Sequence, residues 1–141
     1  MNAQCKPDEV VPPSNRPDRW TIQSTREALS ILADAGSILI VIPRAVDGDA
    51  SRVTTEEAVA AAVDSVEHLL WEVMEMYCNM LCVPGAGWSP LRLAYGLVHT
   101  VSNAFWMGVL DRQLPAIDET HFMAALRIAN GYVDQAVIEL A

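Results

Sequence analysis

The sequence predicts an all-α protein: a four-helix, mostly antiparallel bundle preceded by a flexible, Pro-rich N-terminal arm. Residues 54–82 contain no Gly and no Pro, and their apolar residues recur alternately four and three positions apart, which marks one face of a helix. The same spacing recurs in residues 28–42, 91–105 and 122–140. Because the connections between these segments are short, neighbouring helices are expected to run in opposite directions.

Two parts are expected along the chain, a flexible arm over residues 1–19 and a single helical domain over residues 20–141. The arm is rich in prolines, which disfavour both helix and paired strand: Pro7, Pro12, Pro13 and Pro17. Trp20 and Ile22 follow the arm and are expected to anchor its end on the domain.

The first helix is expected to begin at Ser24, which forms a capping box with Glu27. Gly36 interrupts the apolar pattern, and residues 37–42 are also compatible with a short strand. Helix is favoured because no second β-rich run exists to pair with them. Pro43 disfavours helical geometry in the residue before it, so the helix is expected to end there. The predicted buried face is Ala28, Leu32, Ala35, Leu39 and Ile42.

The longest helix is expected over residues 54–82, with Thr54 and Glu57 as its capping box. It would be about 42 Å long at 1.5 Å per residue, so the other helices are expected to pack along it. Its predicted core face is Val59, Val63, Val66, Leu70, Val73, Tyr77 and Met80.

The third helix is expected to start with Ser89 as N-cap and Pro90 at the first helical position, and Pro115 should end that segment. Asp118 can cap the fourth helix. The predicted buried residues are Leu91, Ala94, Val98, Val101 and Phe105 in the third helix, and Phe122, Leu126, Ala129, Val133, Ala136 and Leu140 in the fourth.

The chain of 141 residues is acidic, with a formal net charge of −9. The acidity lies mainly after residue 53, where there are eleven Asp or Glu residues and three arginines. The longest predicted helix carries six of these acids and no Lys or Arg. Direct binding to nucleic acid is therefore not expected, because phosphate contacts need Lys and Arg. An acidic surface favours a partner with a basic surface.

Cysteine content and hydropathy predict a reduced, cytoplasmic protein. The three cysteines are an odd number, and two of them lie four residues apart on one predicted helix, unlike a disulfide framework. No signal peptide is visible at the N-terminus. The most apolar stretch, residues 91–110, contains Arg92, His99 and Asn103, so no membrane span is expected.

A metal-binding or small-ligand-binding bundle is the alternative function that the sequence offers. Asp64, His68 and Glu72 lie four apart on one predicted helix face, and His99 or His121 could complete a site. The Glu-x-x-His pattern of bundle metal sites is absent, and this stripe lies opposite the apolar face. Soft-metal binding at Cys78 and Cys82 needs more ligands than these two thiolates. No metal site or cofactor is therefore predicted.

No catalytic residues are predicted. The chain has no Gly-x-Ser-x-Gly nucleophile elbow and no phosphate-binding Gly-x-x-x-x-Gly-Lys motif. A Cys–His pair, such as Cys78 with His99, remains an open arrangement because such side chains can meet in space. The chain is expected not to be an enzyme.

The leading hypothesis is a small acidic protein-binding module, an inhibitor, immunity-type or regulatory factor that acts through contact with another protein. Tryptophans beside acids are frequent anchors of protein interfaces. A homodimer is a further possibility that the sequence leaves open. The predicted partner-binding residues, from the acidic helix and the outer side of the third helix, are Glu67, Trp71, Glu72, Glu75, Arg92, Asn103 and Trp106.

Overall fold

The computed structural model of the protein describes residues 20–47, 56–80, 85–110 and 119–141. It places their side chains except at positions 43–47, 56–58, 105–110 and 119–120. These residues form four helices, α1 (Ile22–Asp47), α2 (Glu56–Met80), α3 (Trp88–Leu110) and α4 (Glu119–Leu140), and no strand occurs among them. The predicted four-helix bundle is confirmed, and the alternative strand at residues 37–42 is wrong, because these residues continue α1.

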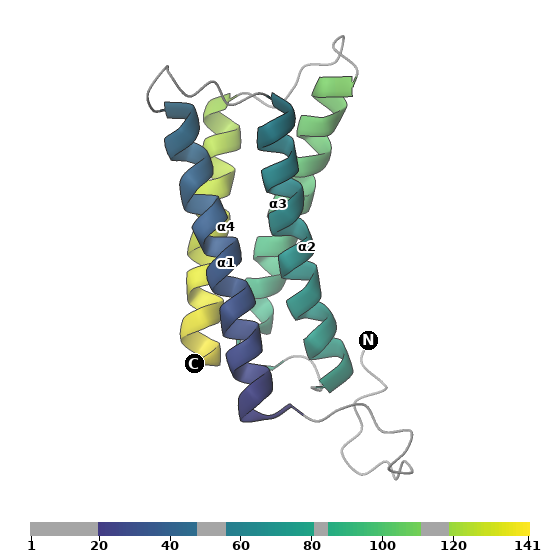
Figure 1. The fold of residues 1–141 in the computed structure, drawn as a ribbon, viewed down its shortest axis with the longest axis vertical. Coiled ribbons are helices and arrows are strands. Elements are labelled where there is room, and N and C mark those ends of the chain that lie inside the picture. Colours follow the sequence, from purple (N-terminus) through teal and green to yellow (C-terminus); the bar gives the residue numbers. More distant parts are fainter. Residues whose placement is uncertain (1–19, 48–55, 81–84, 111–118) are drawn as a thin grey trace.

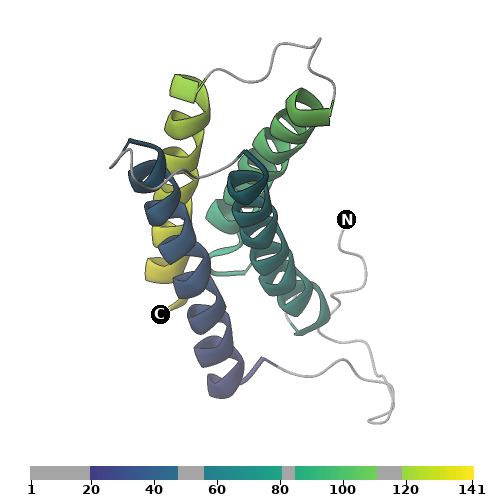
Figure 2. The same ribbon diagram turned by 45° about the horizontal axis from the view of Figure 1, so that its top comes forward.

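Consecutive helices run in opposite directions (Figure 1). α1 contacts α2 and α4, and α3 contacts the same two helices. Figure 2 shows α1 beside α4 and α2 beside α3. Each helix therefore turns one face inward and leaves an outer face to solvent.

The core face predicted for the longest helix is confirmed from Val59 to Tyr77, whereas Met80 is only partly buried. Val66, Leu70 and Val73 have no exposed side-chain surface, and Tyr77 is 1% exposed. The buried residues predicted for the other helices also lie in the core, except that Leu140 is partly exposed and the side chain of Phe105 lies outside the described residues.

The N-terminus of α1 differs from its prediction. Thr21, not Ser24, caps the helix: the Ser24 amide donates to Thr21 Oγ1 over 3.1 Å, and the Thr21 amide donates to Ser24 Oγ over 3.1 Å. The reciprocal pair is a capping box one helical turn earlier, with a serine in the place of the usual Glu or Gln. Ile22 is 76% exposed, so it does not anchor the chain, whereas Trp20 does.

α1 continues through both predicted interruptions, Gly36 and Pro43, to Asp47. Inside a helix, proline removes the hydrogen bond to the carbonyl four residues earlier, and its ring crowds that carbonyl. Leu39 and Ile42 are buried immediately before it, so their packing holds the helix where local preference disfavours it.

α3 begins at Trp88, earlier than predicted, because Gly87 provides the turn. Gly87 has φ of 83°, a conformation that costs little only for glycine. Its carbonyl accepts the first helical bond, from the Leu91 amide at 3.1 Å. Ser89 and Pro90 consequently lie inside the first turn, so the prediction that they are the N-cap and first helical residue is wrong.

Three aromatic rings close the end of the bundle near the α2–α3 turn. The Tyr77 ring lies 5.1 Å from Trp20 and 5.7 Å from Trp88, measured between centroids. Its hydroxyl donates to the carbonyl of Ala86, and burial, aided by Glu139, raises the pKa of Tyr77 to about 12. This cluster ties the start of α1, the end of α2 and the start of α3 together.

Some predictions concern residues outside the described ranges: the arm at residues 1–19, the Thr54 cap, Cys82, Pro115 and Asp118.

Candidate functional site

The outer sides of α2 and α3 meet in a group of polar and aromatic side chains, here called the α2–α3 flank. It comprises Glu67, Trp71 and Glu75 of α2 and Tyr95, His99 and Asn103 of α3. The three α2 residues lie four positions apart, and so do the three α3 residues. Each group of three therefore forms one stripe along its helix. The antiparallel arrangement brings the two stripes together.

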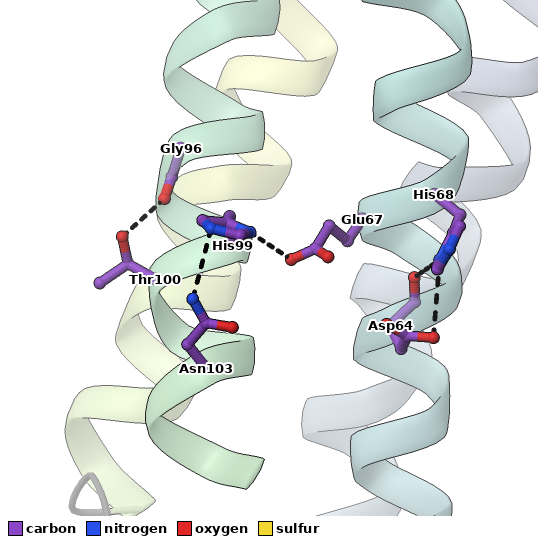
Figure 3. A network of polar contacts seen from close by, with 7 residues as sticks. All are labelled: Asp64, Glu67, His68, Gly96, His99, Thr100 and Asn103. Atoms are coloured by element: carbon purple, nitrogen blue, oxygen red, sulfur yellow. Dashed lines mark hydrogen bonds and ion pairs between the residues drawn. The ribbon is translucent and has the colours of Figure 1, made fainter. Parts of the chain in front are cut away.

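His99 joins the two helices. Its Nδ1 lies 2.9 Å from Glu67 Oε1, and its Nε2 lies 3.3 Å from the amide nitrogen of Asn103. With that amide donating to Nε2, Nδ1 carries a proton and donates to Glu67. Figure 3 shows His99 and Glu67 reaching toward each other across the space between the helices. The Glu67 side chain is only 18% exposed, so its carboxylate mainly serves this bridge.

Tyr95 extends the bridge into a row of three rings. Its ring stacks on His99, with centroids 5.6 Å apart and planes 15° apart, and it contacts Trp71 at 5.4 Å with planes 44° apart. Burial, and next the negative charge of Glu67, raise the pKa of Tyr95. The Tyr95 ring in turn packs against the indole of Trp71.

Trp71 is held at two points yet remains half open to solvent. Tyr95 supports its ring, and its Nε1 donates to Glu75 Oε1 over 2.6 Å. The residue is still 47% exposed. A large ring held in one position loses little conformational freedom when it is buried by a partner. Trp71 is therefore suited to act as an interface anchor.

The remaining predicted partner-binding residues lie around this flank to different degrees. Glu72 is exposed, but it follows Trp71 directly, which places it about 100° further around α2. Arg92 is exposed on α3, three residues before Tyr95 and so on the same side of the helix. Trp106 belongs to α3, but its side chain lies outside the described residues.

The residues of the metal-binding alternative are not brought together in the described part of the chain. His68 Nδ1 donates to the Asp64 carbonyl over 2.8 Å and lies 3.5 Å from the Asp64 carboxylate. Figure 3 shows this pair on a different side of α2 from Glu67 and His99. The carbonyl of Asp64, and then its carboxylate, raise the pKa of His68. Within residues 20–47, 56–80, 85–110 and 119–141, no three His, Cys, Asp or Glu side chains are grouped to hold a metal ion.

Cys78 and His99 do not form the pair that the sequence left open. His99 contacts Glu67, which precedes Cys78 by about three helical turns, or roughly 16 Å along α2. Cys78 is exposed with a free thiol.

The sequence interpretation missed the roles of Tyr95 and His99 as the link between the two stripes. The sequence numbers of these residues nevertheless indicate the link between the two stripes. Glu67 and His99 each lie sixteen residues from residue 83, between α2 and α3 in the sequence, and Trp71 and Tyr95 each lie twelve from it. In an antiparallel helix pair, residues at equal distances from a short turn lie at similar heights.

None of the helices in the described ranges is long and apolar enough to cross a bilayer. No known protein family, no characterised protein and no solved structure matches this chain.

Proposed function

We infer that the protein is a small protein-binding module that docks a basic partner on the α2–α3 flank. One observation carries this inference: Trp71 is 47% exposed although Tyr95 and Glu75 hold its ring in place. Interface hot spots are enriched in tryptophan and lie where a large ring can be fully desolvated by the partner. A role as inhibitor or regulatory factor follows if the docked surface is the partner's working surface.

The charge around Trp71 supports a basic partner. α2 contains six acids and no Lys or Arg, and Glu75 lies at the edge of the indole itself. A field of one sign accelerates encounter with molecules of the opposite sign and excludes molecules of the same sign. A second copy of this chain docking through the same flank would bring acids against acids, so a different, basic protein fits better.

The cytoplasm is the proposed location. Cys78 carries an exposed free thiol, and such thiols persist in compartments that glutathione and thioredoxin keep reducing.

The test is an affinity enrichment from lysate of the source cells with three versions of the tagged protein: the unmodified chain, Trp71→Ala and Ile128→Ala. Ile128 is a matched control because it is a large apolar residue of α4 with 53% exposure. We expect one basic protein to be retained by the unmodified chain and by Ile128→Ala and lost with Trp71→Ala. Equal retention by all three versions, with circular dichroism confirming that each is folded, would contradict the proposal.

A further inference from the structure

Two neighbouring side chains of the α2–α3 flank, Trp71 and Glu75, indicate which kind of basic group on the partner would bind there. Trp71 presents an aromatic ring, and the carboxylate of Glu75 is fixed at the edge of that ring by the 2.6 Å bond from Nε1 to Oε1. An aromatic face and a carboxylate are thus held side by side, and both are exposed.

The Trp71 ring is contacted by Tyr95 and remains partly exposed to solvent. Tyr95 contacts the indole at a centroid distance of 5.4 Å, and Tyr95 itself is supported by His99 at 5.6 Å. Trp71 is nevertheless 47% exposed. A planar group can therefore stack on the exposed part of the indole, here called its open side, while Tyr95 keeps its contact with the ring.

The carboxylate of Glu75 keeps most of its capacity to accept hydrogen bonds. A carboxylate has two oxygens with about four acceptor positions, and the bond to Trp71 uses one of them. Glu67, by contrast, is 18% exposed and already bonded to His99. Glu75 is therefore the carboxylate that a ligand stacked on Trp71 can reach.

Among biological cations, guanidinium fits this pair of groups best. It is planar and weakly hydrated, stacks on aromatic faces, and donates to carboxylates through a rigid fork of N–H groups. An ammonium group can also lie over an indole, but it is compact and strongly hydrated and makes no forked contact. A neutral planar group lacks the attraction of the carboxylate.

We propose that the Trp71–Glu75 pair is an arginine-binding site, in which a guanidinium of the partner protein stacks on the open side of the indole and donates to Glu75. This proposal rests on the proposed function, because it identifies the partner's contact at the same flank. Tyr95 and His99 are positioning residues, since they support the indole without contacting the guanidinium.

The experiment is an NMR titration of the full-length protein with three acetylated and amidated pentapeptides of sequence Gly-Ser-X-Ser-Gly, where X is arginine, lysine or citrulline. Citrulline keeps the planar shape of arginine without its charge. The readout is the indole N–H resonance of Trp71, assigned by its disappearance in Trp71→Phe. We expect the arginine peptide to bind roughly two- to fivefold more tightly than either of the others, as for an exposed cation–π contact. Equal affinities of the three peptides would overturn the proposal.

Two variants separate the roles of the ring and the carboxylate. Glu75→Gln should reduce the preference for arginine over citrulline, and Trp71→Ala, followed through the backbone amide of Glu75, should abolish the shifts. Ile128→Ala should bind the arginine peptide like the unmodified chain. An arginine preference that survives in both Glu75→Gln and Trp71→Ala would also refute the assignment.

The outcome is independent of the lysate enrichment. A partner that is lost with Trp71→Ala, together with no preference for the arginine peptide, refutes the arginine site alone. An arginine preference without any enriched partner supports the site while contradicting the protein-binding function.

Discussion

Replacing Gly87 with alanine is expected to destabilise the bundle at the α2–α3 turn. Gly87 has φ of 83°, and an L-residue in the left-handed region costs about 1–2 kcal/mol. A Cβ at this position would also lie 2.7 Å from the Tyr77 hydroxyl oxygen and 3.1 Å from the Ala136 carbonyl oxygen. Real Cβ atoms do not approach oxygen at the shorter distance, so the hydroxyl must move.

The expected magnitude follows from three contributions. Backbone strain costs about 1–2 kcal/mol, and loss of the hydrogen bond from Tyr77 to Ala86 adds about 0.5–1.5 kcal/mol. Alanine restricts the unfolded chain, which offsets about 0.4–1 kcal/mol. The free energy of unfolding should therefore fall by about 0.5–3 kcal/mol in Gly87→Ala.

Gly131→Ala is the matched control. Gly131 lies inside α4, has ordinary helical φ, and a Cβ there meets nothing within 4 Å. The same chemical change should stabilise this variant by about 0.5–1 kcal/mol. Urea denaturation followed by circular dichroism measures both values. A Gly87→Ala protein as stable as Gly131→Ala would refute the assigned turn geometry.

A double-mutant cycle isolates the steric contribution. In a Tyr77→Phe background the hydroxyl is gone, while the backbone strain at Gly87 and the approach to Ala136 remain. Gly87→Ala should thus cost less in that background than in the unmodified protein. Equal costs in the two backgrounds would show that the hydroxyl does not lie against Gly87.

Three further predictions follow from the core and the titrating groups. Leu70→Ala should cost about 2–5 kcal/mol because a fully buried side chain leaves a cavity, whereas exposed Ile128→Ala should change stability by less than about 0.5 kcal/mol; equal denaturation midpoints would mean that the wrong face of α2 was placed inside. The pKa of His68 should exceed 6.5 and move toward that value in Asp64→Asn. The protonated form of His68 contributes stability that is present below pH 6.5 and is lost as pH rises through the higher folded pKa. An NMR titration in which the His68 pKa is higher in Asp64→Asn than in the unmodified protein would contradict the Asp64 contact. Tyr77, with its pKa raised from 10.0 to about 12, should make the protein lose stability as pH rises between these values, and Tyr77→Phe should remove that part of the loss in denaturation at alkaline pH.

Helices and core faces were predictable because they depend on periodicity within one segment. The buried row from Val66 to Tyr77 is an example. Helix ends were less predictable. Thr21 and Ser24 cap each other, while α1 passes Pro43 because the preceding turns are buried. At Pro43, packing between segments overrides the local preference of the sequence.

The candidate site was predictable in its residues but not in its assembly. The acidic stripe and Trp71 could be placed on the outside of one helix from their spacing alone. The bridge from Glu67 to His99 and the contact of Trp71 with Tyr95 depend on the register between two helices. Only the length of the α2–α3 turn carries that information in the sequence.

The binding role of the α2–α3 flank is tested most directly by the association and dissociation rates of the partner retained in the enrichment, measured at two salt concentrations. Trp71→Ala should mainly speed dissociation, by roughly 30-fold if the anchor contributes about 2 kcal/mol. Glu72→Gln should mainly slow association and flatten its salt dependence; Glu67 and Glu75 are left unchanged because Glu67 bridges to His99 and Glu75 is bonded to Trp71. Rates that match those of the unmodified protein in both variants, with the fold intact, would contradict the account.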